Sequence, residues 1–150
     1  MITVRIAADK DRTKIEELFV EMLKSVYSSE DTEGYEEGYL DKFFGGSDRI
    51  YVAESDGEFA GYIAVEVHDG FIYIDDISVG SGYRGFGIGT MLIGAAEAYA
   101  AELGIGISVL HVEVQNTSAL RLYERLGYSR ASLEESRYRM TKKLLCERGE

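Results

Sequence analysis

The sequence predicts an α/β (α+β) domain: a mixed, mostly antiparallel seven-stranded sheet flanked by about four helices, with a bulged central strand. Three short β-rich runs follow one another with Asp-Gly turns between them, which indicates hairpins. A strand, a helix and another strand then alternate, which indicates a crossover connection and helices on both faces of the sheet. The 150 residues fit one domain, 1–150.

The first half of the chain begins with an alternating run at residues 2–6, which predicts a short strand. Asp9 or Asp11 can cap the helix that follows. The apolar stripe of that helix comprises Ile15, Leu18, Phe19, Met22, Leu23 and Val26. Residues 33–44 predict a second, weaker helix with a very acidic start. Three strands are then expected over residues 50–54, 59–67 and 71–79, joined at Asp56-Gly57 and Asp69-Gly70.

The second half alternates helices and strands. A helix is expected over residues 87–103, ended by Gly104. Its apolar face comprises Ile88, Met91, Leu92, Ala95, Tyr99 and Leu103. Residues 107–114 form an apolar, β-branched run that predicts a strand. Asn116 or Thr117 can cap the next helix, which Gly127 terminates. The last two strands are expected at residues 128–132 and 137–144.

The aliphatic pattern of the third hairpin strand changes phase in its middle. Aliphatic residues occupy positions 72 and 74, and then positions 77 and 79, on either side of Asp75-Asp76. One extra residue in a strand produces this shift, so the pattern predicts a β-bulge at Asp75-Asp76. A strand buried on both faces is the alternative.

The charge of the chain bears on the partners that it can bind. The net charge of −11 argues against nucleic-acid binding, which favours a basic surface. Residues 1–80 carry 19 acids and 7 bases, and residues 81–150 carry 8 acids and 9 bases. This asymmetry fits either simple solubility or a cationic partner for the first half and an anionic partner for the second.

Cysteine usage and hydropathy bear on the compartment. Cys146 is the one cysteine, which excludes an intramolecular disulfide and a cysteine-based zinc site and favours a reducing cytoplasm. No apolar run approaches the roughly 20 residues of a membrane span, and the N-terminus shows no signal pattern. We therefore expect a cytoplasmic protein with no membrane partner, and a homodimer is left open.

The glycine-rich segment at residues 79–90 lies between a strand and a helix start. Backbone N–H groups at a helix N-terminus bind phosphate oxygens, glycines permit close approach, and Arg84 adds a charged donor. The dinucleotide pattern G-x-G-x-x-G fails because Thr90 or Leu92 stands where glycine is needed. The Walker pattern fails because no lysine occurs between positions 43 and 141. A purely structural turn is the alternative.

Two motifs give the chain a resemblance to a known family. The run Arg84-Gly85-Phe86-Gly87-Ile88-Gly89 matches the R/Q-x-x-G-x-G/A signature of the GNAT superfamily of N-acetyltransferases. Residues 116–128, NTSALRLYERLGY, resemble the N-x-x-A-x-x-L-Y-E-x-x-G-F segment of that superfamily. The resemblance covers residues 72–130 in detail and nearly the whole chain in element order. It implies a GNAT-like fold and acetyl-CoA as cosubstrate, with no metal.

The resemblance also implies roles for individual residues. The pantetheine arm would pair with the bulged strand, and the pyrophosphate would bind the turn. The residues expected to bind the coenzyme are Ile77, Ser78, Val79, Arg84, Gly85, Phe86, Gly87, Ile88, Gly89, Thr90, Asn116 and Tyr123. Asn116 could contact the pantetheine amides, cap its helix, or do both. Tyr123 could protonate the departing thiolate as a general acid, or it could simply pack its helix.

A general base is needed because the attacking amine must be neutral. His111 and Glu113 share one face of their strand by period 2, and Asp75 or Asp76 lies beside the bulge. Many relatives carry glutamate where this chain has His111, a departure that some protein N-terminal acetyltransferases share. Histidine has a suitable ordinary pKa, although a lone histidine can also be structural. No covalent intermediate is implied, and Cys146 is not expected to be a nucleophile.

The acceptor is expected to be an amine. Residues 30–41 are dense in carboxylates interleaved with aromatics, which suits a cationic acceptor such as a polyamine or an aminoglycoside-like amine. A solvated acidic face is the alternative. Two further functions stay open: a protein N-terminal or lysine acetyltransferase, and a non-catalytic acyl-CoA-binding sensor. An acyl group longer than acetyl is also open.

Overall fold

The computed structural model describes residues 1–27 and 38–144, except for the side chains of residues 23–27. The elements follow the predicted order. They are β1 (Ile2–Ile6), α1 (Arg12–Tyr27), β2 (Arg49–Ser55), β3 (Glu58–His68), β4 (Phe71–Val79), α2 (Ile88–Glu102), β5 (Ile107–Glu113), α3 (Thr117–Arg125), β6 (Ser129–Glu134) and β7 (Arg137–Lys143). Short 3-10 turns lie at Asp9–Asp11, Tyr39–Phe43 and Ser81–Tyr83.

The helices differ in part from the expectation. Within the described ranges there are three α-helices, against the four or so expected. The second helix, expected over residues 33–44, falls partly outside the described residues, and its end is the 3-10 turn Tyr39–Phe43. Cys146 also lies outside them. Asp11 accepts a hydrogen bond from the backbone N–H of Ala8 at 2.7 Å and pairs with Arg5, so it anchors the turn that leads into α1.

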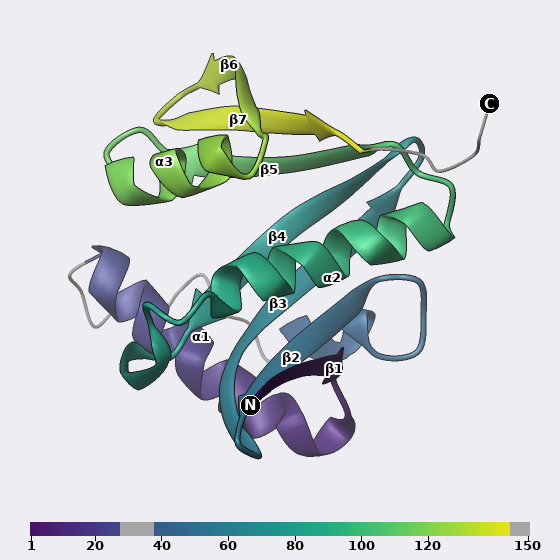
Figure 1. Ribbon diagram of the computed structural model, residues 1–150, viewed down its shortest axis with the longest axis vertical. Coiled ribbons are helices and arrows are strands. Elements are labelled where there is room, and N and C mark those ends of the chain that lie inside the picture. Colours follow the sequence, from purple (N-terminus) through teal and green to yellow (C-terminus); the bar gives the residue numbers. More distant parts are fainter. Residues whose placement is uncertain (28–37, 145–150) are drawn as a thin grey trace.

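The seven strands form one mixed sheet in the order β1-β2-β3-β4-β5-β7-β6. Every neighbouring pair is antiparallel except β4 and β5, which are parallel because α2 connects them as a crossover. Figure 1 shows α2 in front of the sheet and α1 behind it, with β4 and β5 close together at one end and diverging toward the other. The prediction of a mixed, mostly antiparallel sheet is confirmed.

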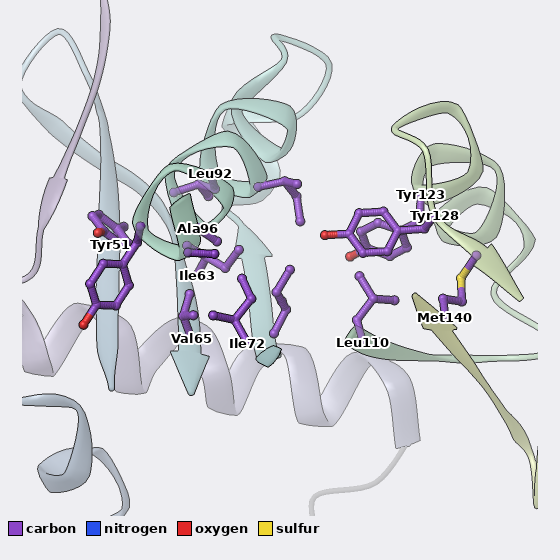
Figure 2. Packing of buried hydrophobic residues seen from close by; sticks show 14 of the residues in the cluster. Tyr51, Ile63, Val65, Ile72, Leu92, Ala96, Leu110, Tyr123, Tyr128 and Met140 are labelled. Carbon is purple, nitrogen blue, oxygen red and sulfur yellow. The ribbon is translucent and has the colours of Figure 1, made fainter. Parts of the chain in front are cut away.

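Two hydrophobic clusters cover the two faces of the sheet. The larger one packs α2 and α3 against one face and contains Ile63, Ile72, Leu92 and Leu110 (Figure 2). The smaller one packs α1 and the Tyr39–Phe43 turn against the other face and contains Ile15, Val52 and Tyr62. Alternate residues of β2 and β3 therefore enter opposite clusters, as strand geometry requires. Within the described residues, none of the helices is both long and apolar enough to span a membrane.

The predicted bulge is confirmed in β4. Ala64 of β3 pairs with Asp76 and the next residue pairs with Ile74, so Asp75 is the unpaired extra residue. The four aliphatic residues of the strand consequently pack against the same cluster under α2, although their spacing breaks period 2. They are Ile72, Ile74, Ile77 and Val79. The side chains of Asp76 and Ser78 lie toward α1 instead, because they pair with Ala64 and Tyr62.

The close approach of β3 to the end of β4 at Gly61 can be tested by adding a side chain there. A Cβ built on Gly61 would lie 2.5 Å from the carbonyl oxygen of Ser78 and 3.1 Å from Cα of Val79, so the strands must move apart to admit it. We expect Gly61→Ala to lower the free energy of unfolding by about 1–3 kcal/mol in urea denaturation.

Gly94→Ala is the matched control. Gly94 is exposed in α2, and its added Cβ would meet no atom within 4 Å. Alanine there should raise stability by about 0.5–1 kcal/mol, because glycine is a poor residue for a helix interior. Equal stability of Gly61→Ala and the wild type would contradict the close approach of β3 to Ser78 and Val79.

Candidate active site

The divergence of β4 and β5 opens a hollow in the sheet. Parallel pairing joins Ile72 to Ser108 and Tyr73 to Val109, and the bulge at Asp75 follows directly. Beyond it the two strands diverge (Figure 1). A hollow of about 280 Å³ lies there. Its lining comprises Met22, Ile74, Asp75, Asp76, Ile77, Leu110, His111, Val112, Glu113, Asn116, Ala119, Tyr123 and Arg137. Because β4 pairs with β5 only at Ile72 and Tyr73, the later backbone groups of β4 on that side have no partner strand. They are therefore available to a ligand, since backbone N–H and C=O groups need hydrogen-bond partners.

Tyr123 enters this hollow from α3. Its side chain is 8% exposed and packs edge-on against Tyr128, with the ring centroids 6.0 Å apart. Figure 2 shows its ring extending from α3 toward the middle of the core. Burial, with a smaller contribution from the charge of Asp76, raises its pKa to about 12. The hydroxyl therefore keeps its proton at neutral pH, and no group among the described residues hydrogen-bonds to it.

The bulge brings two neighbouring carboxylates to the hollow. The hydroxyl of Tyr39 donates to Asp75, and the hydroxyl of Tyr62 donates to Asp76. Burial is the main cause that raises the pKa of both carboxyls, to about 6 for Asp76, and each is raised further by a neighbouring acidic charge. The negative charge of this pair makes the hollow attractive to an ammonium group.

His111 lies at the centre of a hydrogen-bonded chain that joins residues of β4, β5 and β6. Its Nδ1 is 2.7 Å from the hydroxyl oxygen of Tyr73, and its Nε2 is 3.0 Å from Oε1 of Glu134. The bond to His111 is the main cause that lowers the pKa of Glu134. A Glu134 carboxylate accepts the Nε2–H proton, which leaves Nδ1 to accept from Tyr73. Glu113 lies nearby and accepts a hydrogen bond from Ser136 at 3.0 Å.

The predicted general acid, Tyr123, and the candidate general bases, His111 and Glu113, approach the hollow from different faces of the sheet. Tyr123 belongs to the cluster under α2 and α3. His111 and Glu113 alternate with Leu110 and Val112, which belong to that same cluster, so they point toward the α1 face. The prediction that His111 and Glu113 share one face is confirmed, and the gap between the strands makes both faces accessible to one ligand.

The glycine-rich turn forms a second hollow at the end of β4. Gly85 and Gly87 have φ angles of +87° and +82°, a conformation that favours glycine, and Gly87 is the residue before α2. This hollow, of about 420 Å³, has a lining that comprises Val79, Tyr83, Arg84, Gly85, Gly87, Ile88, Gly89, Thr90, Leu122 and Arg125. Exposed amides at the start of α2 beside Arg84 suit the oxygens of a diphosphate.

The two hollows are close enough to hold one elongated ligand. Ile77 lines the first and Val79 the second, and two residues of extended strand span about 7 Å. Helix α3 likewise contributes Tyr123 to the first hollow and Leu122 to the second. An extended chain with a diphosphate at one end fits this pair of hollows, as the pantetheine diphosphate of coenzyme A would.

Most of the predicted site residues line one of the two hollows, with two exceptions. Ser78 is buried on the α1 side and Phe86 is 69% exposed, and neither of them lines a hollow. Asn116 lines the first hollow and also caps α3, since its Oδ1 accepts from the N–H of Ala119 at 3.3 Å. Tyr73, which hydrogen-bonds to His111, and Arg125, which lines the second hollow, were not among the predicted site residues, because their placement depends on which strands and helices become neighbours.

Within residues 1–27 and 38–144, no three His, Cys, Asp or Glu side chains are grouped to hold a metal ion. A buried tyrosine, several potential bases and a cradle for a diphosphate define instead a site for acyl transfer from coenzyme A to a nucleophile.

Comparison with known proteins identifies the family. Residues 12–128 match the family model described as the acetyltransferase (GNAT) family, so the chain belongs to that family. An uncharacterised N-acetyltransferase of Methanocaldococcus jannaschii is 34% identical over 126 residues, which cover 83% of this chain and 76% of that protein. Streptothricin acetyltransferase of Streptomyces lavendulae is 36% identical over 96 residues, which cover 62% of this chain and 51% of that protein.

A solved structure shows the same fold with the coenzyme present. The PaiA N-acetyltransferase of Thermoplasma acidophilum, crystallised in complex with coenzyme A, superposes with a TM-score of 0.78. The match covers 95% of this chain and 99% of that one, at 20% sequence identity. These findings establish an acetyl-CoA-dependent acyltransferase of the GNAT fold.

The raised pKa of Asp76 predicts a pH-dependent cost to folding. Its carboxyl has an ordinary pKa of 3.8 and a folded pKa of about 6, so the folded chain holds this proton more tightly than the unfolded chain. The cost is absent below about pH 4 and complete above about pH 6. We expect Asp76→Asn to gain up to about 3 kcal/mol of stability relative to wild type between pH 4 and pH 7, measured by urea denaturation.

Asp69→Asn serves as the control for this measurement. Asp69 is exposed in the turn between β3 and β4, so its replacement removes the same charge without relieving burial. An identical pH trend in the two variants would show that net charge, and not the burial of Asp76, controls the stability.

Proposed function

We propose that the protein transfers an acetyl group from acetyl-CoA to a primary amine of a cationic acceptor, by direct attack and without a covalent enzyme intermediate. The observation that carries the proposal is the hollow between β4 and β5, which brings a protonated tyrosine and potential bases to one cavity. A polyamine or an aminoglycoside-like amine is the class of acceptor that we favour.

Three carboxylates support a cationic acceptor. Asp75, Asp76 and Glu113 all line the hollow, and Asp75 and Asp76 accept hydrogen bonds from neutral donors and form no ion pair within the described residues. Their negative charge is thus free to attract an ammonium group. Much of the acidic segment 30–41 lies outside the described residues. Of its described members, Asp41 forms an ion pair with Arg12 at 2.6 Å, which leaves the carboxylates of the hollow as the support for this proposal.

We assign the base to His111, with Glu113 as its competitor. The chain from Tyr73 through His111 to Glu134 can accept a proton from the amine: His111 lines the hollow, and its Nδ1 takes the proton once it gives up its bond to the Tyr73 hydroxyl. Glu134 stabilises the imidazolium that forms. Glu113 is also in the lining but is already engaged with Ser136, and it would have to take the proton directly.

Tyr123 is assigned as the general acid. Acetyl-CoA supplies an activated thioester, and amine attack expels a thiolate that needs a proton. The hydroxyl of Tyr123, with its pKa of about 12, is protonated at neutral pH and lines the hollow. The coenzyme would be held by the backbone of Ile77 and Val79, by the amides of residues 84–90 and by Asn116, in keeping with the lining of both hollows.

A second candidate function is acetylation of a protein N-terminus or lysine. It is favoured by His111, which stands where many relatives carry glutamate, as in some protein N-terminal acetyltransferases. A panel of polyamines, aminoglycosides and short peptides, measured by release of free thiol, distinguishes the two acceptors through kcat/KM.

Replacement of Tyr123 tests the general acid. Tyr123→Phe keeps the ring and removes the proton, so we expect kcat to fall by about 10²–10⁴ in the thiol-release assay. Acetyl-CoA affinity should be unchanged in calorimetry. Tyr138→Phe is the control, because Tyr138 lies on β7 outside both hollows. If neither the wild type nor any variant turns over while acetyl-CoA still binds, the protein is a sensor and the enzymatic proposal is wrong.

The base is tested by His111→Gln and Glu113→Gln. If His111 takes the proton, His111→Gln should lower kcat/KM by about 10²–10⁴, whereas Glu113→Gln should lower it far less. The opposite pattern would move the assignment to Glu113. Tyr73→Phe should lower kcat/KM less than His111→Gln does, because Tyr73 only positions the imidazole.

A further inference from the structure

We propose that Arg125, at the C-terminal end of α3, binds the 3′-phosphate of coenzyme A. Through this contact the protein would distinguish coenzyme A from 3′-dephospho-coenzyme A. This inference rests on the proposed function, since it concerns the coenzyme site, and it assigns a specificity residue that neither the glycine turn nor the bulged strand contains.

The lining of the second hollow is unusual in its charge. The whole chain has a net charge of −11, yet this hollow is lined by two arginines and by no carboxylate. Arg84 comes from the turn before α2, and Arg125 comes from the last turn of α3. Two cations from elements some 40 positions apart in sequence thus meet at one cavity, which points to a ligand with more than one anionic group.

The two arginines differ in what holds them. Nε of Arg84 donates to the carbonyl oxygen of Val79 at 3.1 Å, which fixes this side chain beside the turn. Arg125 forms no hydrogen bond or ion pair within residues 1–27 and 38–144. Some arginines of the chain are instead paired with carboxylates, as Arg5 is with Asp11 and Arg130 is with Glu124. Arg125 is therefore available to an anion from outside the chain.

The chemistry of the coenzyme distributes its charges in a matching way. A diphosphate diester carries one charge on each phosphorus and suits the row of neutral amides at the start of α2. A phosphate monoester carries about −1.5 to −2 at neutral pH and is bound best by a cationic donor. The C-terminal end of α3 would by itself repel an anion, because carbonyl oxygens point outward there. Arg125 reverses the sign of the potential at that end.

Helix α3 holds Arg125 in a fixed relation to the reaction centre. Tyr123 of this helix lines the first hollow, and Leu122 and Arg125 line the second. The buried side chains of Leu120 and Tyr123 pack α3 against the core, so the helix cannot rotate freely. A coenzyme anchored by Arg125 would thereby be placed along β4 with its thioester end toward Tyr123.

Calorimetric titration with coenzyme A and with 3′-dephospho-coenzyme A tests the proposal without any turnover. The wild type should bind coenzyme A at least about tenfold more tightly than the dephospho form. Arg125→Gln should lose about tenfold in affinity for coenzyme A and keep its affinity for the dephospho form. Arg125→Lys should retain part of the preference, because it keeps the charge and loses the bidentate geometry.

Arg121→Gln is the matched control. Arg121 lies one turn earlier on the same exposed side of α3 and lines neither hollow, so its removal should leave both affinities unchanged. The unfolding temperature without ligand is recorded for every variant. It separates lost binding from lost helix stability, since a basic residue in the last turn also favours the helix dipole.

The outcomes separate this proposal from the proposed function. Equal binding of both coenzymes by the wild type would overturn the role of Arg125 while leaving acetyl transfer intact. An equal loss for both coenzymes in Arg125→Gln would also overturn it, because the contact would then be to the diphosphate or be purely structural. If the wild type bound neither coenzyme, the proposed function itself would fail.

Discussion

One extra residue in β4 controls the architecture of the site. Asp75 has no partner on β3, and this insertion shifts the alternation of every residue after it. Ile77 and Val79 thereby remain under α2, and β4 turns away from β5 where their pairing ends. If Asp75 paired regularly with β3 and the strand had no bulge, Ile77 and Val79 would point toward α1. The hollow, its two carboxylates and the free edge of β4 all follow from this one insertion.

The features that depend only on residues close together in the sequence were predicted correctly. The phase change around Asp75, the Asp-Gly turns and the cap at Asn116 each depend on residues only a few positions apart. The helix expected over residues 33–44 differs where the structure describes it, because the chain forms a 3-10 turn at Tyr39–Phe43. There Leu40 and Phe43 are buried against α1 and the sheet, so tertiary packing outweighs a modest helix propensity.

The parts of the site that could not be predicted depend on which elements become neighbours. Tyr73, His111 and Glu134 lie on β4, β5 and β6. They meet although β7 lies between β5 and β6, an order that differs from the order along the chain. Arg125 reaches the glycine turn because α3 packs on the same face of the sheet as α2. The motif at residues 84–89 could be found from its own spacing, but its cationic partner on α3 carries no local signal.

The separation of the two faces bears directly on the chemistry. A proton must leave the amine while another reaches the thiolate, and a base adjacent to the acid would simply exchange protons with it. Here Tyr123 enters from the α2 side, and His111 points toward the α1 side. A thioester lying in the gap between β4 and β5 would therefore meet its acid on one face and its acceptor on the other. Because the sheet itself keeps these groups apart, the burial that raises the pKa of Tyr123 need not weaken the base.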